Sequence, residues 1–427
     1  MRLLALFLLA ALLGASTASG ADDTLAPVSE ALAKVRATRG ANKDRDAGPE
    51  LTLVKDRLRA WVESQLPPAP TTGDTAHPIF WNDPHVVAGL SQRLSKTLDG
   101  AGLTCGLPNI SDRCTDRDDR NFENDRGYLG PVEVSWLDSG RYLLVETMVG
   151  VRCGFDDSAY VYQRGKGQKW TLLLATEQNR YDEKAYAPQA ITSVQVSPSR
   201  SSLGEPAEPP LVLTLGYSLS CSGSWQVLYS RLWRASRSMV APPTLIDRQD
   251  TLFIGNESLG SARLRNEDLL IEFDGSSIDA DRLVRDHVRH YLIKPADKLE
   301  RIAPVALNPD DFVDEWINSD WAEAAHWIAP GASTSLEKFH RIAPGRLGQF
   351  DGTAKRCRAD PTLWQVNFSI EEAKAGKKDA DPPSHFLVRW MAPYRFTLIK
   401  AQRTPFPRCD VAVEMPDNIG TLFPASG

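Results

Sequence analysis

The chain has 427 residues, of which 42% are hydrophobic and 24% are charged, a composition that suits a folded protein of roughly two or three structural units. Its 49 basic and 55 acidic residues give a net charge of −6, and the charges alternate in sign along the chain. This pattern argues against a nucleic-acid-binding surface and against attachment to an anionic membrane.

The N-terminus has the pattern of a secretion signal. Arg2 precedes an apolar run at residues 3–13, and the small residues at 18–21 offer a cleavage site for signal peptidase. The run is shorter than the stretch of about 20 residues that a bilayer requires. We therefore expect residues 1–20 to be removed and the mature chain, with no transmembrane span, to be periplasmic or secreted.

Three helices are expected before the first strand. Apolar residues recur at helical spacing in 51–66, a shorter helix is expected at 28–36, and both belong to a helical and linker segment at 21–74. A third helix is expected at 84–98, because an Asp-Pro pair at its start provides the N-cap and the first helical residue.

The third helix and a charged loop make up the segment 75–127. The loop, at residues 105–127, interleaves aspartates and glutamates with arginines. Dense carboxylates are typical of calcium loops, but their order does not follow the EF-hand pattern and the arginines offset most of the charge. We interpret the loop as one whose charges pair with one another, closed by a disulfide between Cys105 and Cys114.

Six cysteines remain in the mature region. They are Cys105, Cys114, Cys153, Cys221, Cys357 and Cys409. An even number in an oxidising compartment predicts disulfides, whereas a zinc site is not expected because the cysteines are scattered and no Cys-x-x-Cys pair occurs. Their grouping along the chain favours the pairs Cys105–Cys114, Cys153–Cys221 and Cys357–Cys409.

A β-pattern recurs in residues 128–178, 191–250 and 251–307, and we assign 128–307 to a β-meander domain. In each copy a long apolar strand leads through a loop into an aromatic-containing strand, a short turn and a closing strand. Four short strands per copy are typical of propeller blades, while an irregular antiparallel sandwich accounts for the same strand lengths. The run 136–145 contains Asp-Ser-Gly-Arg-Tyr before an apolar strand and resembles the hairpin of β-propeller blades.

The segment 308–427 is expected to combine a helix with an antiparallel sheet. Asn308 and Pro309 start a helix at 310–328, and alternating β-patterns follow it. The predicted fold class is therefore mainly β. It comprises repeated four-stranded antiparallel meanders, propeller-like or packed as a sandwich, with a helical N-terminal segment and an α+β C-terminal part.

Sequence motifs assign no catalytic residue, cofactor or metal. The Gly-x-Ser-x-Gly elbow, the phosphate-binding loop and the dinucleotide fingerprint do not occur. His287 and His290 are three residues apart and fall on opposite faces of the strand expected at 284–293, so they are not expected to share a metal. The paired carboxylates Asp310/Asp311 and Asp314/Glu315 are expected on the solvent face and at the N-terminus of their helix rather than as glycosidase pairs.

The chain has 11 tryptophans, and most of them alternate with polar neighbours as core residues do. An exposed subset would mark a ligand surface, for which the candidates are Trp316, Trp321 and Trp327. The sequence favours an exported, non-enzymatic binding or scaffold protein whose loops, at one end of the meanders, take a protein, peptide or glycan ligand.

Two other functions remain open from the sequence. One is a secreted hydrolase acting on cell-envelope glycan or peptide, and the other is a structural subunit of an envelope assembly. A hydrolase is expected to gather at least two carboxylates with perturbed pKa values in one pocket. A binding protein is expected to have an aromatic-lined groove without such a set.

Overall fold

The computed structural model divides the chain into two compact units, which are described separately. Unit 1 comprises Met1–Gly223 and Leu228–Arg248, and unit 2 comprises Ser224–Val227 and Gln249–Gly427. The structure describes residues 20–37, 48–69, 84–104, 127–138, 140–151, 154–164, 169–177, 189–197, 209–218, 223–235, 244–254, 259–277, 284–341, 347–350, 354–370, 384–391 and 394–412. The predicted signal peptide lies outside these residues except for Gly20.

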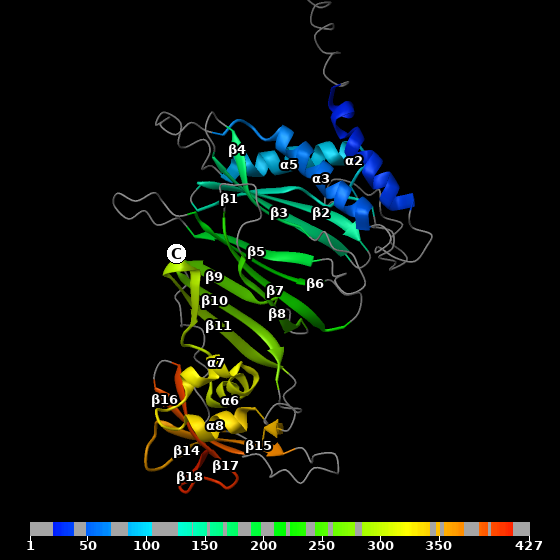
Figure 1. Cartoon of the computed structure of the whole chain (residues 1–427). Helices are drawn as coiled ribbons and strands as arrows, with labels where there is room; N and C mark the ends of the chain where they lie inside the picture. Colours follow the sequence, from blue (N-terminus) through cyan, green and yellow to red (C-terminus); the bar gives the residue numbers. More distant parts are fainter. Residues whose placement is uncertain are drawn as a thin grey trace, which may run out of the picture. The chain divides into compact units, whose positions relative to one another are not determined.

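Three helices of unit 1 cover one face of a four-stranded sheet (Figure 1). They are α2 (Gly20–Ala37), α3 (Gly48–Gln65) and α5 (Pro84–Gly100). α5 begins at the predicted residue, α3 begins three residues before its predicted start, and α2 begins eight residues before its predicted start. Buried leucines and valines from all three form one core cluster with the sheet. Two serine side chains of α5, Ser91 and Ser95, also accept the backbone N–H groups of Val134 and Val132, so the helix is joined to the edge strand by hydrogen bonds as well.

The sheet beneath these helices is a simple antiparallel meander. Its strands, in spatial and chain order, are β1 (Glu133–Leu137), β2 (Tyr142–Val151), β3 (Gly154–Arg164) and β4 (Trp170–Thr176). The strand β2 is buried along most of its length, which explains its nearly unbroken apolar sequence. Odd-numbered residues of β2, such as Leu143 and Val145, face the helices. Even-numbered ones, such as Leu144, face the opposite side.

A second antiparallel meander packs against that opposite side. It consists of β5 (Gln189–Ser197), β6 (Leu211–Ser218) and β7 (Trp225–Arg234). Leu144 and Val161 of the first sheet share a buried cluster with Val194, Val212 and Trp233 of the second. Face-to-face burial of this kind is the packing of a β-sandwich. The prediction of a mainly β fold built from antiparallel meanders is confirmed, in its sandwich-like form.

Unit 2 begins with a third antiparallel meander. Its strands are β9 (Ser261–Arg265), β10 (Asp268–Ser276), β11 (Val284–Lys294) and β12 (Lys298–Arg301), and the end of β8 (Thr244–Phe253) also pairs with β10. β10 and β11 pair over their whole length. The 3-10 turn η5 (Pro295–Asp297) lies between β11 and β12.

The rest of unit 2 is a helical layer on an antiparallel sheet. The helical elements are α6 (Pro309–Asn318), α7 (Trp321–Ala324), η6 (Ala325–Trp327) and α8 (Ser333–His340). The strands are β13 (Leu347–Phe350), β14 (Lys355–Cys357), β15 (Leu363–Ile370), β16 (His385–Met391), β17 (Arg395–Gln402) and β18 (Cys409–Ala412). Their aromatic side chains form the core between the two layers. None of the helices that the structure describes is long and apolar enough to cross a membrane.

The prediction of one continuous helix over 310–328 is wrong. Asn308 does cap the start, where its side chain accepts the backbone N–H of Asp311 at 2.7 Å. The helix stops at Asn318, because Ser319 and Asp320 adopt extended backbone angles. The break lets the chain turn back so that the Trp316 indole donates to the carbonyl of Ala324 at 3.2 Å.

Candidate functional site

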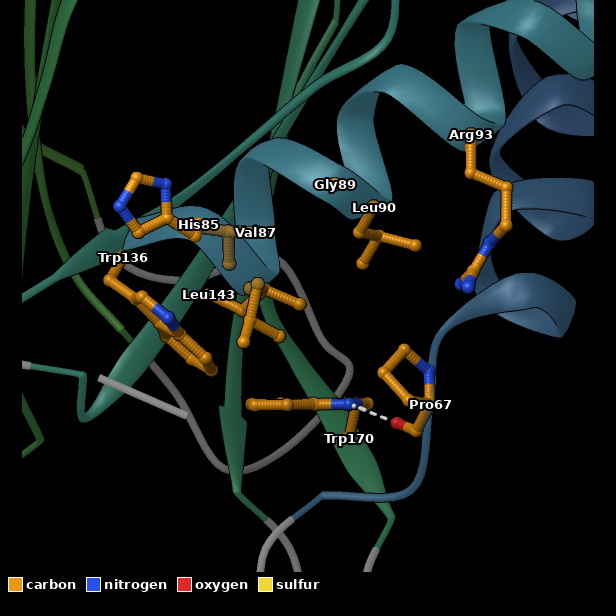
Figure 2. A pocket seen from close by; sticks show the side chains of 10 residues that line it. Pro67, His85, Val87, Gly89, Leu90, Arg93, Trp136, Leu143 and Trp170 are labelled. Carbon is orange, nitrogen blue, oxygen red and sulfur yellow. Dashed lines mark hydrogen bonds between the residues drawn. The ribbon is translucent and has the colours of Figure 1, made fainter. Parts of the chain in front are cut away.

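A pocket of about 380 Å³ lies on the helix-covered face of the first sheet in unit 1. Its walls come from the start of α5, from β1, β2 and β4, and from Pro67 just beyond α3 (Figure 2). This volume lies within the usual range of small-molecule sites. The pocket therefore lies beside a helix on the face of the first meander. The sequence instead predicts a ligand site in the loops at one end of the meanders.

Two tryptophans form the floor of the pocket. Trp136 is paired with Leu143 across β1 and β2, so both side chains face the helix layer, and Trp170 begins β4. The ring centroids of Trp136 and Trp170 are 5.8 Å apart and the planes are inclined at 43°. The Trp170 indole N–H donates to the carbonyl of Pro67 at 2.9 Å, which fixes the orientation of the ring. Both tryptophans are only partly buried, so part of this aromatic surface is accessible.

The opposite wall is one side of α5. His85, Gly89 and Arg93 are spaced four residues apart, so they form a stripe along the helix, and Leu90 adds an apolar contact. Figure 2 shows His85 at the Trp136 end of the pocket and Arg93 at the end near Pro67. A Cβ atom added at Gly89 would meet no heavy atom within 4 Å, so the glycine leaves this wall open.

The chemistry of the lining is aromatic and basic. Among the residues that the structure describes, no carboxylate lines the pocket, and the ionisable side chains in its lining are His85 and Arg93. An aromatic floor offers a broad apolar face to a flat ring, while a guanidinium is a permanent cation with several donors. The described lining of the pocket is therefore suited to holding a ligand with a ring and a negative charge.

The tryptophans proposed from the sequence as a ligand surface lie in unit 2. Trp316 is completely buried, Trp327 is 8% exposed, and Trp321 is partly buried and packs against the same core cluster. Trp316 also stacks on Phe339 and contacts His340 edge-on. These side chains fill the core between α6, α8 and the sheet instead of forming an exposed platform.

One predicted disulfide lies in the described residues. Cys357 and Cys409 are bonded and join β14 to β18 at the end of unit 2. This confirms the pair that sequence grouping placed around the C-terminal segment. Cys105, Cys114, Cys153 and Cys221, with their two predicted pairs, lie outside the described residues, as does the charged loop at 105–126.

Unit 2 also holds a buried cluster of charges around Glu315, on α6. Arg285 Nη2 donates to Glu315 Oε2 at 2.9 Å and Arg301 Nη2 donates to Oε1 at 3.1 Å. A third guanidinium, of Arg289, also donates to Oε1. His287 Nδ1 lies 3.7 Å from Oε2. One carboxylate thus holds three arginines that are each less than a tenth exposed.

The cluster follows from the period of two in a β-strand. Arg285, His287 and Arg289 alternate on one face of β11, and Arg301 lies on the same face because it is paired with Tyr291. Glu315 approaches this face from α6. The prediction that Asp314 and Glu315 face solvent is wrong, since both are only 2% exposed. Their helix is packed on both sides, by β11 and by the C-terminal sheet.

The electrostatics of the cluster hold Glu315 ionised. Burial alone raises the pKa of this carboxyl, but the guanidinium groups of Arg289, Arg301 and Arg285 and the imidazole of His287 together hold the pKa well below its usual range. Burial lowers the pKa of His287 and the neighbouring arginines reinforce this, against the opposing effect of Glu315. The cluster is thus an ion-pair network with a neutral imidazole, closed to solvent. We assign it a structural role.

The two histidines of β11 face different surroundings, as the strand prediction requires. The His287 ring stacks on Phe273 and its Nε2 lies 2.9 Å from the carbonyl of Ser276. His290 contacts Asp268 and the carbonyl of Ala303 instead. A side chain at Gly275 would come within 2.6 Å of the His287 ring, so the glycine makes room for this imidazole.

Unit 1 holds two carboxyl groups with raised pKa values between its two sheets. Burial, together with the like negative charge of Glu133 across the strands, raises the pKa of Glu146 to about 7. Burial also raises the pKa of Asp157 to about 7. The charges of Asp156 and Glu146 add to this effect, while the hydrogen bond from the Ile191 N–H opposes it. Neither carboxylate lines the pocket described above.

Because of these two acids, unit 1 is expected to lose stability as the pH rises from about 4 to about 7. Unfolded Glu and Asp ionise near pH 4, so between about pH 4 and pH 7 the folded state binds more protons than the unfolded state. Stability then falls with rising pH, by at most roughly 4 kcal/mol per group, because the pKa rises by up to about 3 units and each unit is worth about 1.4 kcal/mol. The double substitution Glu146→Gln and Asp157→Asn is expected to flatten this dependence.

Urea unfolding as a function of pH checks this expectation, with a fluorinated Trp170 reporting on unit 1 by NMR. Glu30→Gln, which removes an exposed acid of α2, is the matched control and should leave the slope unchanged. An unchanged slope in the double variant would show that the two acids are not the cause.

The functional residues that sequence reasoning missed had weak signals. Trp136 and Trp170, like most of the tryptophans, alternate with polar neighbours, and this pattern predicts core residues. The spacing of His85, Gly89 and Arg93 becomes meaningful only once α5 is known to lie over β1. A comparison with models of protein families gives no match for the chain, and a comparison with curated proteins gives none either.

Proposed function

We propose that this chain is an exported, non-enzymatic binding protein that takes a small ligand in the pocket between α5 and the Trp136–Trp170 floor. The observation that carries the proposal is an aromatic-lined pocket in which the bond from Trp170 to Pro67 orients one ring, and whose described lining residues include no carboxylate. A pre-oriented aromatic surface lowers the entropic cost of binding a ring.

Export is supported by two observations of different kinds. The N-terminal sequence has the order of a signal peptide, with Arg2 before an apolar run. The bond between Cys357 and Cys409 is typical of proteins that fold in an oxidising compartment. We therefore place the binding activity in the periplasm or outside the cell.

The alternative function, a hydrolase acting on cell-envelope glycan or peptide, has one observation in its favour. Glu146 and Asp157 have pKa values near 7, which is suited to acid–base catalysis. They lie between two packed sheets, and the described pocket does not reach them. Binding is therefore better supported than hydrolysis.

A single substitution tests the binding proposal. Gly89→Phe is expected to place a ring in the open space of the pocket without a clash and to improve helix propensity. It should abolish binding of ring-bearing probes, measured by titration calorimetry and ligand-observed NMR with indole and glucose. The matched control is Gly100→Phe at the far end of the same helix, where an added Cβ is equally unhindered.

The controls make the result decisive. Thermal unfolding of both variants should show a folded protein at least as stable as the original chain. Binding that persists in Gly89→Phe, or that Gly100→Phe reduces equally, would place the ligand elsewhere.

A further inference from the structure

The ligand class follows from where charge lies in the pocket, and this inference rests on the proposed function. We infer that the pocket selects a ring with an apolar face that carries a carboxylate, with the ring on the Trp170 face and the carboxylate at Arg93. The chemistry is shared by aromatic acids and by sugar acids.

The ring position is set by the floor. Trp136 and Trp170 are in contact with each other at 5.8 Å, so a ligand lies on a face of the pair and does not insert between the rings. Figure 2 shows the Trp170 ring opposite the α5 side chains Leu90 and Arg93. The space between this ring and the helix is apolar along its length, with Val87 and Leu143 beside it.

The charge preference comes from Arg93. In the part of the chain that the structure describes, no carboxylate forms an ion pair with its guanidinium and none lines the pocket. A guanidinium matches the geometry of a carboxylate with two parallel donors. A cationic ligand is disfavoured, because the positive charge of Arg93 would repel it and no described lining residue offers a negative charge.

The orientation follows from the two ends of the stripe on α5. His85 and Arg93 are eight positions apart, which places them about 12 Å apart along the helix axis, with Gly89 between them. The gap at Gly89 leaves the middle of the wall open for the body of the ligand. Arg93 then holds the anionic end near Pro67, and His85 faces the other end beside Trp136 (Figure 2).

Matched pairs of probes test this inference on the full chain. One pair is phenylacetate and phenylacetamide, and the other is glucuronate and glucose. In at least one pair the acid is expected to bind about tenfold more tightly than its neutral partner, a difference that corresponds to about 1.4 kcal/mol. The preference should weaken as ionic strength rises, because Arg93 is exposed. The pair that shows it identifies the source as an aromatic acid or a sugar acid.

Two variants complete the test. Arg93→Gln should remove the preference for the acid while leaving the neutral probe bound, whereas Lys96→Gln, which removes an exposed cation of the same helix outside the pocket, should leave it intact. Equal binding of acid and neutral partner, or a preference that survives Arg93→Gln, overturns the ligand class alone. If no probe binds to the original chain, the proposed function fails together with this inference.

Discussion

Replacing Glu315 by alanine is expected to destabilise unit 2 by about 3–5 kcal/mol, the usual cost of removing one partner from a buried ion pair. The variant leaves Arg285, Arg289 and Arg301 facing one another in a site where each is less than a tenth exposed. Asp314 and Asp250 still pair with Arg285 and Arg289, but these pairs do not replace the central carboxylate. Typical domains have only about 5–15 kcal/mol of net stability, so the loss is a large share of the total.

The measurement is hydrogen exchange by mass spectrometry on the full chain. Peptides from α6 and β11 should lose protection, while peptides from α3 and β2 in unit 1 serve as an internal reference. The control is Glu337→Gln, which breaks an exposed pair with Arg341 and should cost less than about 1 kcal/mol. Unchanged protection in β11 would refute the structural role of Glu315.

The Glu315 cluster also predicts the direction of acid sensitivity. The pKa of Glu315 is lower in the folded state than in the unfolded state, so the unfolded state binds the proton first as the pH falls. The stabilisation is fully present above about pH 4.3 and is lost below it as the pH falls through the folded pKa. This direction is opposite to that of Glu146 and Asp157 in unit 1.

Breaking the pair between Lys55 and Asp156 is expected to cost unit 1 a similar amount. Lys55 Nζ lies 2.7 Å from Asp156 Oδ2, and both side chains are 0% exposed. Lys55→Met leaves a buried carboxylate without its cation, for which we expect a loss of about 3–5 kcal/mol. Asp156 also accepts the N–H of Gln189 at 3.1 Å, so it connects α3 to β5 as well as to β3.

A double-mutant cycle separates the pair from its surroundings. The change Asp156→Asn removes the charge but keeps an oxygen for the Gln189 N–H. Combined with Lys55→Met, it should recover at least about 1 kcal/mol relative to the sum of the single changes. Urea unfolding followed through unit 1 measures the cycle, and Asp56→Asn, in an exposed pair with Arg59, is the control. Additive losses would show that the two charges do not interact.

The strand expected at 284–293 was predictable, and it corresponds to β11 (Val284–Lys294), one residue longer. Its valine, tyrosine and isoleucine residues favour a strand, although burial does not alternate strictly along it. The start of α5 was predictable for a local reason, the Pro84 that opens it. By contrast, β18 was missed, because only pairing with β14 defines it.

The buried charges and the pocket were not predictable, for a physical reason that they share. Lys55 and Glu315 are charged residues on helices, which local sequence assigns to the solvent face. Their burial depends on partners that are far along the chain, Asp156 on β3 and the arginines on β11 and β12. The pocket likewise depends on how α5 lies over Trp136 and Trp170, which no local pattern encodes.

The most direct test of ligand binding in the pocket beside α5 is fluorine NMR. The chain is labelled with fluorotryptophan at its 11 tryptophans and titrated with phenylacetate and glucuronate. Single Trp→Phe variants assign the resonances. A bound probe is expected to shift the resonances of Trp136 and Trp170 and to leave those of Trp316, Trp321 and Trp327 in place. Shifts confined to the three tryptophans of unit 2, or no shift at Trp136 and Trp170 with either probe, would contradict binding in this pocket.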